Sequence, residues 1–147
     1  MTRRFVSLPF VMLAAAFAQD KPAMNALEKD FQQSMSGVTL VGHYSREGAA
    51  GLSDDKYTID KVTKIKDGLW QFDTRIQYGK NDIKMPIPLH VEWAGDTPVL
   101  ELTDESIAGM GKFTARIVIY RGQYAGTWSS AQGHGGQMFG KVVKASQ

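Results

Sequence analysis

The chain has 147 residues, no cysteine, and 17 Lys and Arg residues against 15 Asp and Glu residues. The absence of cysteine excludes disulfides, thiolate metal sites and cysteine nucleophiles. Arg3 and Arg4 lie in a segment that we expect to be removed, which leaves 15 basic and 15 acidic residues, and such an even balance argues against nucleic-acid binding.

Residues 1–18 have the pattern of a secretory signal peptide. Arg3 and Arg4 form a positive n-region, an apolar stretch follows, and Ala16-Phe17-Ala18 is a small-x-small cleavage site. The alternative is an N-terminal membrane anchor, but the apolar stretch is shorter than the roughly 20 residues that span a bilayer. We therefore expect an exported protein, periplasmic or secreted, that begins near Gln19 and is not an integral membrane protein.

Residues 19–36 are predicted to form a polar leader and one short helix. Asn25 is a candidate N-cap, and Glu28 follows three residues later, as in a capping box. Apolar residues then recur at one-face helical spacing up to Phe31. We expect the helix to end within residues 34–37 and to cover the end of a sheet, because about three turns need packing to persist.

From residue 37 onward the hydrophobic period changes from that of a helix to two, which indicates strands separated by turns. Asp67-Gly68 and Gly122-Gln123 predict tight turns, whereas residues 45–55 and 104–111 are predicted to be longer loops. The eight predicted strands are residues 38–44, 56–65, 69–78, 83–93, 98–103, 112–121, 124–129 and 137–144.

Two prolines distinguish the fourth of these strands. Pro86 and Pro88 fall on the same face and cannot donate hydrogen bonds to a neighbouring strand. The first half of the strand is therefore expected to be a sheet edge, a bulge or a splayed corner.

These patterns place residues 37–147 in one all-β domain. Eight sequential strands with short turns predict a single antiparallel eight-stranded up-and-down barrel with a short N-terminal helix, because closure removes the exposed edges of a meander. A barrel of this size is nearly filled by side chains or holds one small ligand. The alternative fold is a two-sheet sandwich with the proline-bearing strand at the sheet boundary.

Two tripeptides resemble the Gly-x-Trp motif of calycin-like barrels, the group that includes lipocalin-like and avidin-like proteins. Gly42-His43-Tyr44 follows the predicted helix with tyrosine in the tryptophan place, and Gly126-Thr127-Trp128 lies in the seventh strand. The resemblance implies a fold with a ligand cavity. It also implies an aromatic residue that packs across one barrel end beneath a cation of the last strand, for which Lys141 and Lys144 are the candidates here.

Large aromatic residues on the apolar strand faces are the candidate ligand-binding residues. In a wide barrel they would line a pocket for a small apolar or planar ligand, whereas in a narrow barrel they would fill the core. The six candidates are Tyr44, Trp70, Phe72, Trp93, Phe113 and Trp128.

Catalytic motifs are sparse in this sequence. It contains no Gly-x-Ser-x-Gly elbow, no closely spaced histidine pair for a metal and no phosphate loop, so no catalytic residue, metal or cofactor is predicted. His90 is two residues from Glu92 on one strand face, and His134 lies among glycines. Both are also explained as ordinary exposed polar residues.

Three functions follow from these observations. The first is an exported, non-catalytic binding module for a small apolar ligand. The second is an accessory domain with a filled core that binds a protein partner, using the loops at 45–55 and 104–111 or an exposed strand edge. The third is a barrel enzyme that uses His90 or His134, which would require a histidine at the mouth of the cavity.

Overall fold

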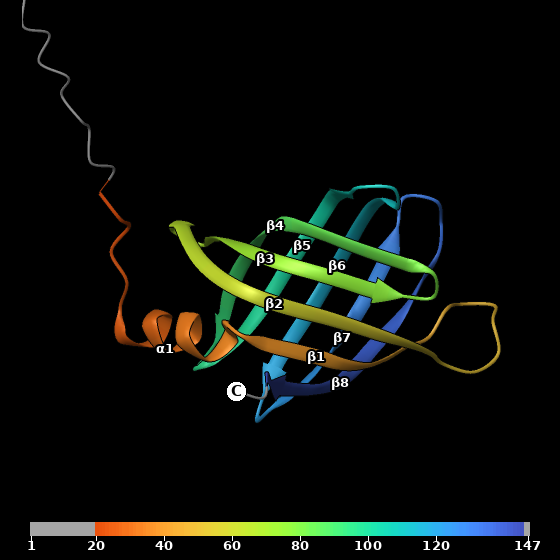
Figure 1. Ribbon diagram of the computed structural model, residues 1–147, viewed down its shortest axis with the longest axis horizontal. Helices are drawn as coiled ribbons and strands as arrows, with labels where there is room; N and C mark the ends of the chain where they lie inside the picture. The colour runs from red at the N-terminus through yellow and green to blue at the C-terminus, as the bar shows by residue number, and fades with distance from the viewer. Residues whose placement is uncertain (1–19, 146–147) are drawn as a thin grey trace, which may run out of the picture.

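The computed structural model describes residues 20–145, so the predicted signal peptide lies outside the described residues. Within them, one helix, α1 (Ala26–Met35), precedes eight strands (Figure 1). The strands are β1 (Val38–Tyr44), β2 (Ser53–Lys66), β3 (Leu69–Tyr78), β4 (Asn81–Ala94), β5 (Thr97–Ile107), β6 (Gly111–Tyr120), β7 (Gln123–Ser130) and β8 (Gly135–Lys144).

The strands form one closed antiparallel barrel in sequence order, which confirms the predicted fold class. Closure occurs where β1 pairs with β8 along its whole length, from Val38 opposite Lys144 to Tyr44 opposite Met138. The orange first strand and the dark-blue last strand therefore lie side by side in Figure 1. The alternative of two separate sheets is wrong, because this seam leaves no boundary between sheets.

Two predicted loops are shorter in the structure because the flanking strands extend into them. β2 begins at Ser53, where Ser53 pairs with Tyr44 of β1, so the first loop covers only residues 45–52. β5 continues to Ile107 instead of ending at residue 103. A register shift between Leu102 and Glu105, with a φ of 51° at Asp104, is a bulge that lets the strand resume its pairing with β6.

The proline-bearing strand is a splayed edge over its first half, as predicted. β4 pairs with β3 from Asn81 to His90, but its pairing with β5 covers only His90 to Ala94, after both prolines. Val91 donates its N–H to the Gly68 carbonyl, on the β3 side of the strand. Because the backbone nitrogens of successive residues in a strand point to opposite sides, those of Pro86 and Pro88 face the β5 side. The prolines thus lack donors on the side where no partner strand lies.

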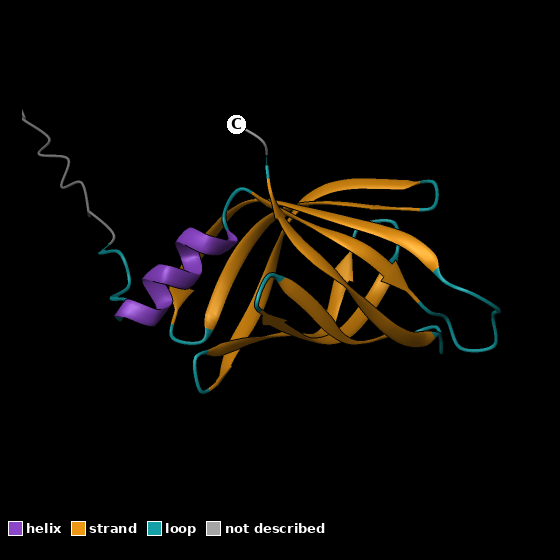
Figure 2. Ribbon diagram, turned by 90° about the horizontal axis from the view of Figure 1, so that it is seen from below, coloured by secondary structure: helices purple, strands orange, loops and turns teal. Residues whose placement is uncertain are grey.

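Helix α1 closes one end of the barrel, and the β1–β2 loop projects from the other end (Figure 2). Asn25 caps the helix, and the Glu28 carboxylate accepts a bond from the Asn25 N–H, so the predicted capping box is present. The buried Lys64 of β2 donates to the second oxygen of Glu28 at 2.8 Å and to the Ala23 carbonyl at 2.8 Å. These bonds tie the helix to the barrel end.

Candidate functional site

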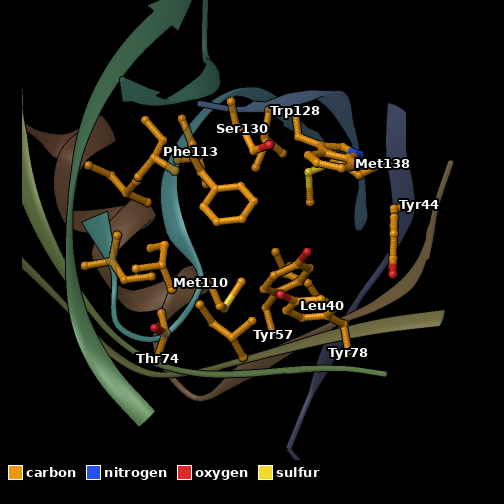
Figure 3. A pocket seen from close by; sticks show the side chains of 18 of the residues that line it. Leu40, Tyr44, Tyr57, Thr74, Tyr78, Met110, Phe113, Trp128, Ser130 and Met138 are labelled. Atoms are coloured by element: carbon orange, nitrogen blue, oxygen red, sulfur yellow. The ribbon is translucent and has the colours of Figure 1, made fainter. Parts of the chain in front are cut away.

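A cavity of about 310 Å³ occupies the barrel interior, between the end that α1 closes and the open end. Figure 3 shows side chains from strands all around the barrel pointing toward this shared space. The cavity reaches the end opposite α1, because the exposed loop residues Arg46, Gln132 and His134 contribute to its wall. Its remaining wall consists of Leu40, Tyr44, Tyr57, Ile59, Phe72, Thr74, Ile76, Tyr78, Ile87, Leu89, Leu100, Leu102, Ile107, Met110, Phe113, Ala115, Ile117, Trp128, Ser130 and Met138.

Four of the six aromatic candidates line this cavity: Tyr44, Phe72, Phe113 and Trp128. The other two, Trp70 and Trp93, lie at the closed end of the barrel. Both make edge-to-face contacts with Phe31 of α1, with ring centroids 5.2 Å and 5.5 Å away. Trp70 is only 1% exposed and belongs to the main core cluster, so the structure places this pair in the seal beneath the helix.

The aromatic residues of the two Gly-x-aromatic tripeptides meet at the open half of the cavity. The Tyr44 and Trp128 rings are 5.9 Å apart in an edge-to-face arrangement, and Phe113 lies 6.3 Å from Trp128. The indole nitrogen of Trp128 donates to the Ser45 carbonyl at 3.1 Å. This arrangement differs from the one that the calycin resemblance implied, because neither lysine of β8 covers these rings. Lys141 is exposed on the outer face of β8, and Lys144 lies opposite Val38, at the other end of the strand from the partner of Tyr44.

Polar groups deep in the cavity wall are already hydrogen-bonded to the protein. The Thr74 hydroxyl donates to the Met85 carbonyl at 2.9 Å, and the Tyr57 hydroxyl donates to the Asp55 carboxylate at 3.0 Å. A buried polar group that is already hydrogen-bonded to the protein does not need a further hydrogen bond from a ligand. The inner wall therefore behaves as an apolar surface.

A buried carboxyl group lies directly behind this wall, and the sequence did not predict it. Asp55 is 3% exposed and accepts hydrogen bonds from Tyr57 at 3.0 Å and from Tyr124 at 2.9 Å. Burial raises the pKa of the Asp55 carboxyl, although the bonds from Tyr124 and Tyr57 act in the opposite direction. Burial and the neighbouring Asp55 also raise the pKa values of both tyrosines, which keeps their hydroxyls protonated as donors.

Two glycines make the Tyr124–Asp55 bond possible. Tyr124 of β7 is paired with Gly140 of β8, which is paired with Gly42 of β1, which is paired with Asp55 of β2. A Cβ atom on Gly42 would collide with the Tyr124 hydroxyl, and one on Gly140 would collide with the Tyr124 ring. The tyrosine therefore reaches across two strands because neither carries a side chain at this level.

The three histidines are exposed and lie on different strands or loops. His43 faces outward on β1, where its Nδ1 is 2.9 Å from the Asp54 carboxylate. His90 faces outward on β4 opposite Glu101. Only His134 lines the cavity, at its mouth. Within residues 20–145, no group of three His, Asp or Glu side chains is placed to hold a metal ion.

Comparisons of the chain with protein-family models, with curated proteins and with solved structures found no match. In the described part of the chain, no helix is both long and apolar enough to cross a membrane.

Proposed function

We propose that this chain is an exported, non-catalytic binding module that holds a small apolar ligand inside its barrel. The observation that carries the proposal is the cavity of about 310 Å³, whose inner polar groups are satisfied by the protein itself. This volume lies at the lower end of the range of about 300–1,000 Å³ that small-molecule pockets occupy. A ligand that fills it would gain about 2.5 kcal/mol for each 100 Å² of apolar surface removed from water.

The cavity favours this function over an accessory domain with a filled core, which would have no such space. Apolar cavities of this kind are poor sites for water, because water needs polar partners that the wall does not offer. The barrel order and the two Gly-x-aromatic tripeptides are consistent with a calycin-like fold, and we include such a relationship in the proposal. Export is proposed from residues 1–18 and predicts a mature chain that begins near Gln19.

The direct test is mass spectrometry of the protein purified natively from its own export compartment. A stoichiometric extra mass that is present in the native spectrum and lost on denaturation would support the proposal and give the ligand class. The same spectra would show whether the mature chain begins at Gln19. A bare polypeptide, unchanged after incubation with a whole-cell lipid extract, would contradict the binding function.

Replacing each of two alanines with phenylalanine tests whether the cavity is the ligand-binding site. Ala115 lies in the cavity wall on β6, so Ala115→Phe would fill the space, whereas Ala125 is exposed on the outer face of β7. Ala125→Phe adds the same ring on the outer face, outside this cavity. We expect Ala115→Phe to abolish binding of a neutral apolar fluorescent probe and Ala125→Phe to retain it. Thermal denaturation of both variants would separate blocked binding from overpacking of the barrel.

A second candidate function is supported by one outer face of the barrel. Val41, Phe139 and Val143 are 45%, 41% and 47% exposed, and all three point outward from the adjacent strands β1 and β8. Val41 lies diagonally opposite both of the others, a spacing at which large side chains reach each other. A protein-binding role for this face predicts that Phe139→Ser weakens capture of a partner and leaves probe binding unchanged.

A further inference from the structure

We propose that the ligand is an amphiphile with one anionic head group, held with its tail in the barrel and its head at the mouth beside Arg46. This inference rests on the proposed binding function and specifies the ligand class and its orientation. Three features support it: the position of the free polar groups of the cavity, the position of its charge, and the closure of one barrel end by α1.

Polar groups are distributed unevenly along the cavity. Thr74, Tyr57 and the indole of Trp128 all donate to protein acceptors, so they have no donor left for a ligand. The hydroxyls of Tyr44 and Tyr78, by contrast, make no hydrogen bond within residues 20–145, and their rings lie 6.1 Å apart near the mouth. Among the described residues of the wall, the free tyrosine hydroxyls therefore lie toward the open end.

The charge of the cavity wall comes from one side chain. Among the described residues that line the cavity, Arg46 is the only charged one, and none carries a carboxylate. The Arg46 guanidinium forms no ion pair with any described residue. Its sequence neighbour Glu47 does not line the cavity but an adjoining hollow, which shares His134 and Ser130 with the cavity wall. An unpaired guanidinium at an apolar mouth favours an oxyanion, which it can hold through two parallel N–H donors.

A cationic head group would find no free carboxylate inside the barrel. Asp55 is buried next to the cavity wall, and both of its carboxylate oxygens accept hydrogen bonds from tyrosines. Asp55 is also absent from the cavity wall, which instead includes its hydrogen-bond partner Tyr57. A ligand cation would therefore meet Arg46 at the mouth and no free carboxylate inside.

The closed end of the barrel sets the direction in which a ligand enters. α1 seals the far end, where Phe31 packs against Trp70 and Trp93. A ligand that comes through the mouth therefore inserts its apolar end first and leaves its polar end at the loops. His134 and Gln132 stand at the same mouth as further donors for an oxyanion.

The test compares three ligands with the same tail and different heads: decanoate, decanol and decyltrimethylammonium, each below its micellar concentration. Binding would be measured by displacement of a neutral fluorescent probe and by calorimetry at low salt. We expect decanoate to bind about fivefold more tightly than decanol, and the cation to bind most weakly. The advantage of decanoate should shrink at about 0.5 M salt, because exposed ion pairs are screened. Decyl phosphate and decyl sulfate would then show which oxyanion is preferred.

Variants connect the preference to Arg46. Arg46→Gln should remove the difference between decanoate and decanol without weakening decanol, whereas Lys141→Gln, the same charge change on the outer wall, should preserve the difference. Equal binding of all three ligands, or a preference that survives Arg46→Gln, would overturn the anionic-head inference and leave the apolar-ligand proposal standing. Failure of all three ligands to bind would instead contradict the proposed function itself.

Discussion

The hydroxyl of Tyr124 on β7 donates a 2.9 Å hydrogen bond to the carboxylate of Asp55 on β2, across the two strands that lie between them. The bond spans the seam where β1 and β8 close the barrel. It therefore joins the early and late strands through their side chains, in addition to the backbone ladder.

Removing this hydroxyl should destabilise the barrel. Tyr124→Phe keeps the buried ring but leaves one Asp55 oxygen without its donor, which should lower the free energy of unfolding by about 1–3 kcal/mol. Urea denaturation would measure the loss. Tyr120→Phe is the matched control, because Tyr120 is 52% exposed and its change should stay within about 0.5 kcal/mol. Equal effects of the two variants would mean that the buried bond has no net stabilising role.

The Asp55 carboxyl should also make stability depend on pH. Its pKa in the folded chain lies above the ordinary value of 3.8. At a pH between 3.8 and the pKa of the folded chain, the folded chain holds a proton that the unfolded chain has released. The stabilisation that comes from this proton is therefore complete below pH 3.8 and is lost as the pH rises through the folded pKa. The stability of the wild type relative to Asp55→Asn should therefore decline with rising pH and then level off. Urea denaturation of both proteins in a pH series would check this, and a relative stability that rises with pH would show that the fold favours the carboxylate.

The two glycines beneath Tyr124 should tolerate no side chain. In Gly140→Ala the added methyl group would meet the Val41 carbonyl oxygen and the Tyr124 ring, so we expect a loss of about 2–5 kcal/mol. Gly48→Ala is the comparison, because nothing lies within 4 Å of its Cβ position and only its φ of 78° opposes the change. That strain costs about 1–2 kcal/mol. A Gly140→Ala protein as stable as Gly48→Ala would show that the strands can separate to admit a methyl group.

The aromatic residues should divide into a sealing group and a cavity group. Trp70→Ala should lower the free energy of unfolding by about 3–5 kcal/mol, because the ring is 1% exposed and packs on Phe31. Trp128→Ala removes a partly exposed ring from the cavity wall, so its main effect should be weaker probe binding. Denaturation and probe titration of both variants would check the division. A Trp70→Ala loss below about 1 kcal/mol would contradict the buried packing.

The prolines of β4 should prevent association through its free edge. Replacing Pro86 and Pro88 together with threonine restores two N–H donors on the side that faces no partner strand, so we expect concentration-dependent oligomers in sedimentation velocity. Pro22→Thr, in the leader before α1, changes the same residue type outside the barrel and should leave the protein unchanged. A double variant that stays in the state of the wild type would mean that the edge is protected by other means.

Alternation and turn residues predicted the strands well where both were clear. The third strand was predicted at residues 69–78, which are the observed bounds of β3, because apolar and polar residues alternate there at all positions except Leu69 and Thr74. β5 was predicted too short because the bulge at Asp104 breaks the alternation before pairing resumes. A bulge depends on the partner strand, which a single segment of sequence does not reveal.

The candidate site was predicted only in part, for a different physical reason. Strand parity identified which aromatic residues face inward, but it did not show how far each lies from the barrel end. Trp70 and Trp93 face inward, yet Phe31 of α1 covers them. Asp55 was missed because an acidic residue beside a glycine-rich stretch reads as loop, and its partner Tyr124 is distant in sequence.

The closing seam between β1 and β8 also has a kinetic consequence. The first strand remains without one neighbour until the last strand is available, because Val38 pairs with Lys144 and Tyr44 with Met138. Contacts so distant in sequence are slow to form, and until they do, two strand edges stay exposed to other chains. The barrel should therefore become resistant to proteolysis in one late step that coincides with the pairing of β8.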